Sequence, residues 1–123
     1  MTPFGERVRA LRRKRGVTMR AMAAALHLSA PYLSALEHGR RGRPTDGLVH
    51  QVCGYFGLFW DDAEELMSLA RLSHPRITVD TAGLSPAKTE LANLLAERIR
   101  TLPEPAVKEA LKLLQPPGRR KRG

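Results

Sequence analysis

The chain has 123 residues, of which 42% are hydrophobic and 27% are charged, and its formal net charge is +9 at pH 7. This length fits one compact domain with a small appendage. No apolar run approaches the ~18 residues that a membrane span needs, and the basic N-terminus lacks the apolar segment of a secretory signal. The single cysteine, Cys53, excludes an internal disulfide framework. We therefore expect a cytoplasmic protein.

The positive charge is concentrated in the first third of the chain. Residues 1–43 carry ten lysines and arginines against two glutamates, a net of +8. Residues 44–73 carry one arginine against five acidic residues, a net of −4, and residues 119–123 add +4. A single-sign field of this strength indicates a surface for a polyanion. The alternative is a basic surface that serves solubility alone.

Helix start and stop signals divide the first part of the chain. Residues 3–15 place apolar side chains at helical spacing among arginines, and Gly16 is expected to end this helix. Thr18 is expected to cap a second helix. Ser29 caps a third, with Pro31 in its first turn, where a missing N–H costs little.

Two more helices complete the predicted first domain. The fourth follows the arginine-rich loop and ends at Gly57, and the fifth has acidic residues on its first turn, where the helix dipole favours them. Five short helices with tight connections predict an all-α domain of about 70 residues. We place this domain at residues 1–73.

The pattern changes in residues 74–115. Ile77 and Val79 alternate as in a β-strand, but the sequence offers no second strand for pairing. This segment is therefore predicted to be either an extended linker or an edge strand that pairs with a second copy. Two amphipathic helices are expected at residues 86–102 and 105–114. Residues 116–123 are expected to form a disordered basic tail.

The second and third predicted helices form a continuous pattern. Residues 18–39 read "TMRAMAAALHLSAPYLSALEHG", with Ala23 at a close-packing point and apolar anchors at Leu28, Leu33 and Leu36. With the "RP" at 43–44, this pattern resembles the Cro/CI-type (XRE, λ-repressor-like) DNA-binding domain over residues 4–72. The resemblance implies a five-helix fold in which the third helix enters the major groove of DNA.

The resemblance also implies the residues that contact double-stranded DNA. They lie on the second helix, on the third helix and in the loop after it: Thr18, Met19, Arg20, Ser29, Ala30, Pro31, Tyr32, Ser34, Ala35, His38, Arg40, Arg41 and Arg43. The ring of Tyr32 would pack along the sugar-phosphate wall, and the loop arginines would follow the backbone or enter the minor groove. Glu37 would form a structural ion pair with Arg12.

The sequence departs from the family pattern in two ways. Met19 stands where many members have a glutamine that clamps a phosphate. The positions that face the bases lack the glutamine, asparagine or arginine that makes bidentate base contacts, and Ser34 alone can donate or accept there. We therefore expect specificity to depend substantially on DNA shape, read by the loop arginines.

The C-terminal third has apolar side chains that a DNA-binding domain does not need. We expect them to form a homodimer that binds a pseudo-palindromic operator, since one helix-turn-helix offers little contact area. The proposed dimerisation residues are Ile77, Val79, Leu91, Leu94, Leu95, Ile99, Leu102, Val107, Leu111 and Leu114. The alternative is that these helices fold back on their own domain.

No residue set in the sequence favours catalysis or a bound cofactor. His50 and Cys53 have the spacing of half a metal site, but no second pair exists, so we expect no metal and no small-molecule ligand. The expected function is a sequence-specific, homodimeric repressor of a promoter. The alternatives are an antitoxin-like autorepressor that holds a partner protein through its C-terminal helices, and a non-specific nucleic-acid-coating protein.

Overall fold

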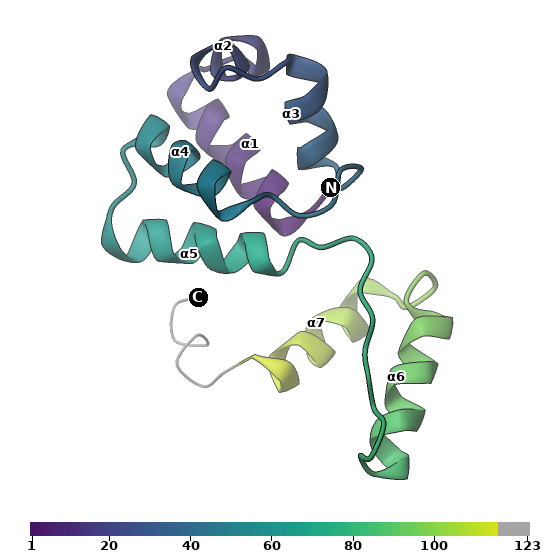
Figure 1. Cartoon of the computed structure of the whole chain (residues 1–123). Coiled ribbons are helices and arrows are strands. Elements are labelled where there is room, and N and C mark those ends of the chain that lie inside the picture. Colours follow the sequence, from purple (N-terminus) through teal and green to yellow (C-terminus); the bar gives the residue numbers. More distant parts are fainter. Residues whose placement is uncertain (116–123) are drawn as a thin grey trace. The chain divides into compact units, whose positions relative to one another are not determined.

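The computed structural model describes residues 1–115, which contain seven α-helices and no β-strand (Figure 1). The chain divides into two compact units, the first over Met1–Ile77 and the second from Thr78 onward. The first unit contains α1 (Pro3–Arg15), α2 (Met19–Ala25), α3 (Ala30–Glu37), α4 (Asp46–Phe56) and α5 (Trp60–Arg71). The second contains α6 (Pro86–Arg98) and α7 (Glu104–Leu114). The predicted all-α class is confirmed.

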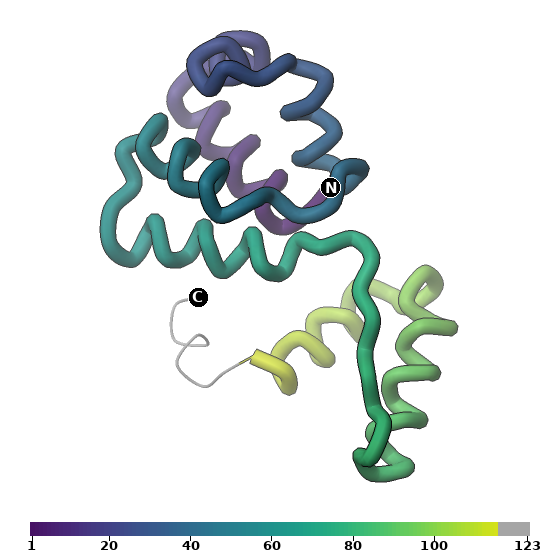
Figure 2. Tube along the Cα trace, viewed as in Figure 1, coloured from purple at the N-terminus to yellow at the C-terminus, as the bar shows by residue number. Residues whose placement is uncertain are grey.

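Of the two alternatives predicted for the segment around Ile77 and Val79, the structure agrees with the linker and does not support the strand. Both residues lie in a segment without regular structure, which the trace in Figure 2 follows between α5 and α6, and both side chains are exposed. A strand is stabilised by its neighbours in a sheet, and no other strand is present in residues 1–115. Alternation of apolar residues was therefore an insufficient signal here.

Helix ends in the second unit also differ from the prediction. α6 ends at Arg98 instead of at residue 102, and the N–H groups of Thr101 and Leu102 both bond to the Arg98 carbonyl in a turn. Pro103 explains the early end, because a proline disfavours helical geometry in the residue before it. The basic tail predicted at residues 116–123 lies outside the described residues.

Side-chain caps begin the helices where the sequence predicts them. The hydroxyls of Thr18 and Ser29 accept hydrogen bonds from the third N–H of α2 and α3, at 3.0 and 3.2 Å. Gly16 and Gly57 end α1 and α4 in the left-handed conformation, with φ of 65° at both positions. Because caps and left-handed glycines act within one turn, these predictions are confirmed.

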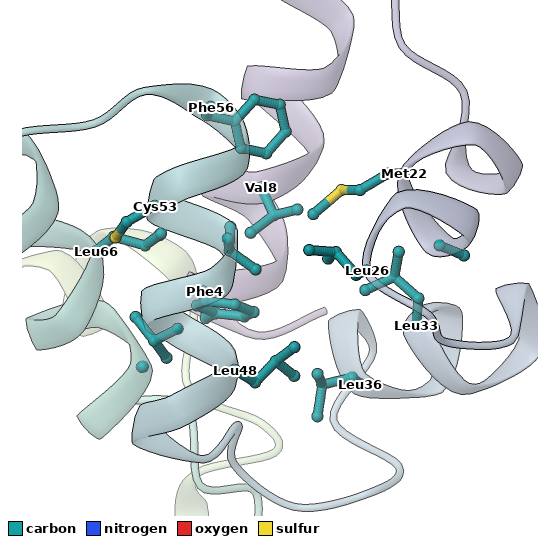
Figure 3. Close-up of a cluster of buried hydrophobic side chains, with 14 residues drawn as sticks. Phe4, Val8, Met22, Leu26, Leu33, Leu36, Leu48, Cys53, Phe56 and Leu66 are labelled. Atoms are coloured by element: carbon teal, nitrogen blue, oxygen red, sulfur yellow. The ribbon is translucent and has the colours of Figure 1, made fainter.

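A single apolar core fills the first unit (Figure 3). α1 packs against α3 and α5, while α2 packs against α3 and α4 against α5. The largest fully buried apolar side chains come from all five helices: Phe4, Val8, Met22, Leu33, Leu36, Val49, Val52, Phe56 and Leu66. By contrast, no residue of the second unit within the described range is buried. The first unit therefore has a core that the second unit lacks.

Glu37, the last residue of α3, links α3 to α1. Its side chain is 1% exposed, and the guanidinium of Arg12 donates from Nη2 to both carboxylate oxygens, at 3.2 and 3.3 Å. The Glu37 carbonyl accepts from the backbone N–H of Thr2 at 3.0 Å and from its hydroxyl at 3.2 Å. The ion pair that the resemblance implied is thus part of a larger junction between α1 and α3.

The N-terminus of α1 is also tied to the end of α5. The hydroxyl of Ser73 accepts a hydrogen bond from the Phe4 N–H at 2.8 Å and donates to the Leu69 carbonyl at 2.6 Å. Ser73 is buried, and its hydroxyl satisfies one of the N–H groups that a helix leaves without an intrahelical partner. The first unit therefore needs the chain as far as Ser73 to complete its packing.

No helix within residues 1–115 combines the length and the apolar character needed to cross a membrane.

Gly5 makes the close approach of α1 to α3 possible, and this generates a prediction about stability. A Cβ at Gly5 would stand 2.1 Å from the Glu37 carbonyl oxygen, which is backbone and cannot rotate away. We expect Gly5→Ala to lower the free energy of unfolding by about 3 kcal/mol, because overpacking forces the helices apart. Urea titration monitored by circular dichroism measures it.

Gly54→Ala is the matched control, because Gly54 also lies inside a helix but its Cβ would meet nothing within 4 Å. Alanine there should stabilise the protein by up to about 1 kcal/mol through helix propensity. Equal effects of the two substitutions would contradict the proposed packing role of Gly5.

Candidate nucleic-acid interface

α2 and α3 pack against each other and are joined by a short turn (Figure 1). The turn begins at Leu26, and the Leu28 N–H bonds to the Ala23 carbonyl at 2.9 Å. Ala23 is buried at the contact, where a small side chain permits helices to approach closely. This geometry is a helix-turn-helix with α3 as the second helix.

His27 carries the turn in an unusual backbone conformation. Its φ is 60°, in the left-handed region that glycine adopts at no steric cost and that other residues adopt with strain. The side chain is exposed. This strain could not be predicted from the sequence, because a polar histidine is common in turns of any backbone conformation.

The outward side of α3 is made of small side chains. Pro31 is exposed, whereas Ala30, Ser34 and Ala35 are half-buried. His38, just past the end of α3, is exposed, and its Nδ1–H donates to the Ser34 carbonyl at 2.9 Å, since a carbonyl oxygen can only accept. The helix therefore presents a smooth surface with few side-chain hydrogen-bonding groups.

At the start of α2, the structure separates the three residues that the resemblance implicates. Thr18 and Arg20 are exposed, and the Thr18 hydroxyl caps the helix. Met19 is half-buried and packs against the core. Met19 thus has a packing contact where a family member's glutamine would face a phosphate.

The loop after α3 carries three exposed arginines, at 40, 41 and 43. Gly39 and Gly42, with φ of 81° and 82°, let the chain turn sharply on both sides of Arg41. The Arg40 N–H bonds to the Ala35 carbonyl at 2.8 Å, which ties the loop to α3. Within residues 1–115 none of the three arginines forms an ion pair, so their charges are free for a partner.

Tyr32 connects this loop to α3. The guanidinium carbon of Arg41 lies 5.7 Å from the centroid of the Tyr32 ring. On the same side of the domain, Tyr32 lines an open hollow of about 480 Å³ with residues of the turn and of α4: Leu28, Thr45, Gly47, Leu48 and Gln51. Sequence analysis missed Thr45, Gly47 and Gln51, although the position of Thr45 as an N-cap directly after a basic loop was a usable signal.

Three arginines of α1 have structural partners, although Arg7 and Arg15 are exposed. Arg7 forms an ion pair with Glu65 of α5, and Arg12 forms the buried pair with Glu37. Arg15 donates a hydrogen bond to the Phe56 carbonyl, and its guanidinium carbon lies 5.8 Å from the centre of the Phe56 ring. The positive charge available to a polyanion is therefore smaller than the net charge counted from the sequence of residues 1–43.

Apart from Ile77, the apolar residues proposed for dimerisation lie in the second unit. α6 carries Leu91, Leu94 and Leu95, which are all exposed, and α7 carries Leu111 and Leu114, which are also exposed. Ile99 caps α6, while Leu102 and Val107 are half-buried. Leu113, which the sequence analysis did not include, is 82% exposed.

The possible metal half-site does not assemble. Cys53 is buried in the core, where burial raises the pKa of its thiol, whereas the neighbouring His50 side chain is exposed. No group of three metal-binding side chains is found within the described part of the chain. Cys53 therefore acts as a core residue.

The sequence is similar to that of known helix-turn-helix proteins. The sequence model of a family described as "Helix-turn-helix domain" matches residues 3–66, which is just over half of the chain. The chain is also 35% identical over 52 residues to the "Uncharacterized HTH-type transcriptional regulator RghRB" of Bacillus subtilis (strain 168). That match covers 42% of this chain and 37% of the relative, so the chain spans little more than a third of the relative's length. No solved structure matches the chain significantly.

The strain at His27 gives a prediction about the turn. We expect His27→Gly to raise the free energy of unfolding by about 0.5–1 kcal/mol, because relief of the left-handed strain exceeds the entropy that glycine adds to the unfolded chain. Thermal and urea unfolding measure it. Gly16→Ala, at the same φ sign, should destabilise the protein. A destabilised His27→Gly variant would mean that the imidazole stabilises the turn by more than the strain costs.

Proposed function

The chain belongs to the helix-turn-helix domain family, and on this premise we propose that it is a sequence-specific, double-stranded DNA-binding regulator of transcription. It acts as a homodimer that occludes a promoter and so represses it, in the cytoplasm at the nucleoid. The observation that carries the proposal is the position of Arg40, Arg41 and Arg43. These exposed cations form no ion pair within residues 1–115, and they follow directly on the second helix of the motif.

Placement of α3 in the major groove accounts for the small side chains on its surface. Ala30, Pro31 and Ala35 allow the helix backbone to approach the floor of the groove, and their apolar atoms can contact thymine methyl groups. Thr18 and Arg20 at the start of α2 then face the phosphate backbone. Exposure of these residues supports the assignment.

Specificity in this arrangement depends substantially on DNA shape. The outward surface of α3 has no side chain that can make a bidentate hydrogen bond to a base, and each such contact would discriminate by about 1–3 kcal/mol. Arginines in a loop can instead sense a narrow minor groove, whose negative potential depends on sequence. The three loop arginines are the residues available for this role.

Dimerisation is proposed through the second unit. One helix-turn-helix module buries only about 600–1,000 Å² on DNA, so tight binding generally requires two modules on adjacent half-sites. α6 and α7 carry leucines that remain exposed among the described residues, including Leu91 at 63% exposure. Burial of these side chains between two copies would supply the stabilisation that the second unit lacks in isolation.

The same exposed leucines favour a second candidate function, that of an antitoxin-like autorepressor. In this case α6 and α7 hold a different protein while the first unit binds DNA. Purification of the chain with a stoichiometric second protein distinguishes this function from self-association. The third candidate, a nucleic-acid-coating protein, requires that random duplex compete as well as any other sequence, with a steep dependence on salt.

Selection from a library of random duplexes at about 0.15 M salt tests the proposed function. We expect the full chain to enrich a pseudo-palindromic site that it binds about 1,000-fold more tightly than a shuffled duplex of equal length. Fluorescence anisotropy measures both affinities. Equal binding of selected and shuffled duplexes would instead favour the coating protein.

Exchange of the central bases of the selected site tests shape readout in the same assay. Replacement of A·T by G·C steps between the half-sites should weaken binding about tenfold, which is comparable to a half-site mismatch. If only half-site changes alter the affinity, shape readout is wrong and α3 reads bases by contacts that its side chains do not suggest.

Removal of the second unit tests the dimer. Residues 1–77 keep Ser73 and the complete core, so they are expected to fold, to be monomeric at micromolar concentration by light scattering, and to bind a two-half-site duplex about 100-fold more weakly. Leu94→Glu in the full chain should also dissociate the dimer, whereas Glu97→Ala should not. A dimeric fragment of residues 1–77 would place the interface in the first unit.

A further inference from the structure

The contact between Arg41 and Tyr32 joins two residues that sequence analysis treated as separate DNA contacts. The guanidinium carbon lies 5.7 Å from the ring centroid, within the distance of about 6 Å at which a cation is attracted by an aromatic ring. Both residues are at the surface, and Arg41 is exposed. Only the tyrosine is fixed by further packing.

Tyr32 is held in the first turn of α3. Its N–H bonds to the Ser29 hydroxyl at 3.2 Å, and its side chain is half-buried and packs against the core. It also lies beside Leu28 and Leu48 at the wall of the hollow between α3 and α4. The ring is therefore part of the folded framework and does not depend on DNA for its position.

Arg41 has no comparable support from its own backbone. It lies between Gly39 and Gly42, which both have positive φ, and its side chain forms no ion pair within residues 1–115. Ordering a long, flexible side chain on binding costs conformational entropy. A ring that orders the guanidinium before binding reduces this cost.

We propose that Tyr32 is a positioning residue for Arg41, so that the ring of Tyr32 orients the guanidinium for DNA before the complex forms. The inference rests on the proposed DNA-binding function, and it adds that the effect of one DNA-binding residue depends on another. The contribution of Arg41 to affinity requires an aromatic ring at position 32. It does not require the tyrosine hydroxyl, because the cation is attracted by the ring face.

Arg43 is a matched control for Arg41. It is exposed, lies in the same loop, and has no aromatic ring beneath it among the described residues. If Tyr32 acted through the general shape of α3, changes at position 32 would alter the contributions of Arg41 and Arg43 alike. If it acts on Arg41 directly, the contribution of Arg43 is independent of position 32.

A double-mutant cycle in the full chain tests the proposal. The variants are Arg41→Ala and Arg43→Ala, each made with Tyr32, with Tyr32→Phe and with Tyr32→Leu, and binding is measured by anisotropy on a 30-base-pair duplex obtained by selection and on a shuffled one. We expect Arg41→Ala to weaken binding about tenfold beside Tyr or Phe and about twofold beside Leu. Arg43→Ala should weaken it equally in all three backgrounds.

Equal losses from Arg41→Ala in the tyrosine and leucine backgrounds would overturn the positioning role. A loss of coupling in Tyr32→Phe would assign the effect to the hydroxyl and would also overturn it. The proposed function fails by a different result, namely equal binding of the selected and shuffled duplexes by the unchanged chain. Circular dichroism melting checks each variant, and all affinities are compared at a temperature at which every variant is folded.

Discussion

The junction at Glu37 is the constraint on which the rest of the DNA-binding unit depends. Its carboxylate binds Arg12, its carbonyl accepts two hydrogen bonds from Thr2, and its backbone lies against Gly5, so α3 is fixed at one end by α1. Arg12 Nε is buried and has no hydrogen-bond partner within the described part of the chain. A buried ion pair with one unsatisfied donor stabilises the fold weakly compared with a well-packed apolar pair. Removal of only one partner, however, would leave the other charge buried and unpaired. The junction therefore matters chiefly because it sets the position of α3.

A rigidly held α3 is consistent with the side chains on its surface. Long, flexible residues can adapt to the groove after docking, whereas small side chains such as Ala30 and Ala35 contact DNA only where the helix backbone is placed correctly. The adaptable side chains are instead in the loop after α3, where glycines with positive φ bend the chain. The unit thus divides the proposed recognition between a smooth, fixed helix and a charged loop, and Tyr32 connects the two.

The sequence predicted those features that are decided within one helical turn. Thr18 and Ser29 could be identified as caps because cap preferences involve neighbouring residues only. The contact between Tyr32 and Arg41 and the hollow beside Gln51 could not be predicted, because both depend on the path of the loop between two helices. The strand alternative at residues 77–79 was not supported, because the alternation of apolar residues there has no partner strand within residues 1–115.

The net charge of the first 43 residues overstates the field that this unit can direct at DNA. The cations of α1 at positions 7, 12 and 15 each have a partner that fixes their geometry, and these contacts hold α1 to α3, α4 and α5. The arginines at 40, 41 and 43 form no ion pair within residues 1–115 and follow directly on α3. Charges at a surface act mainly within a Debye length of about 10 Å. Affinity then depends on where the loop lies more than on the total charge. Because the loop continues from Glu37, the junction that closes the core also determines where these arginines would meet DNA in the proposed complex.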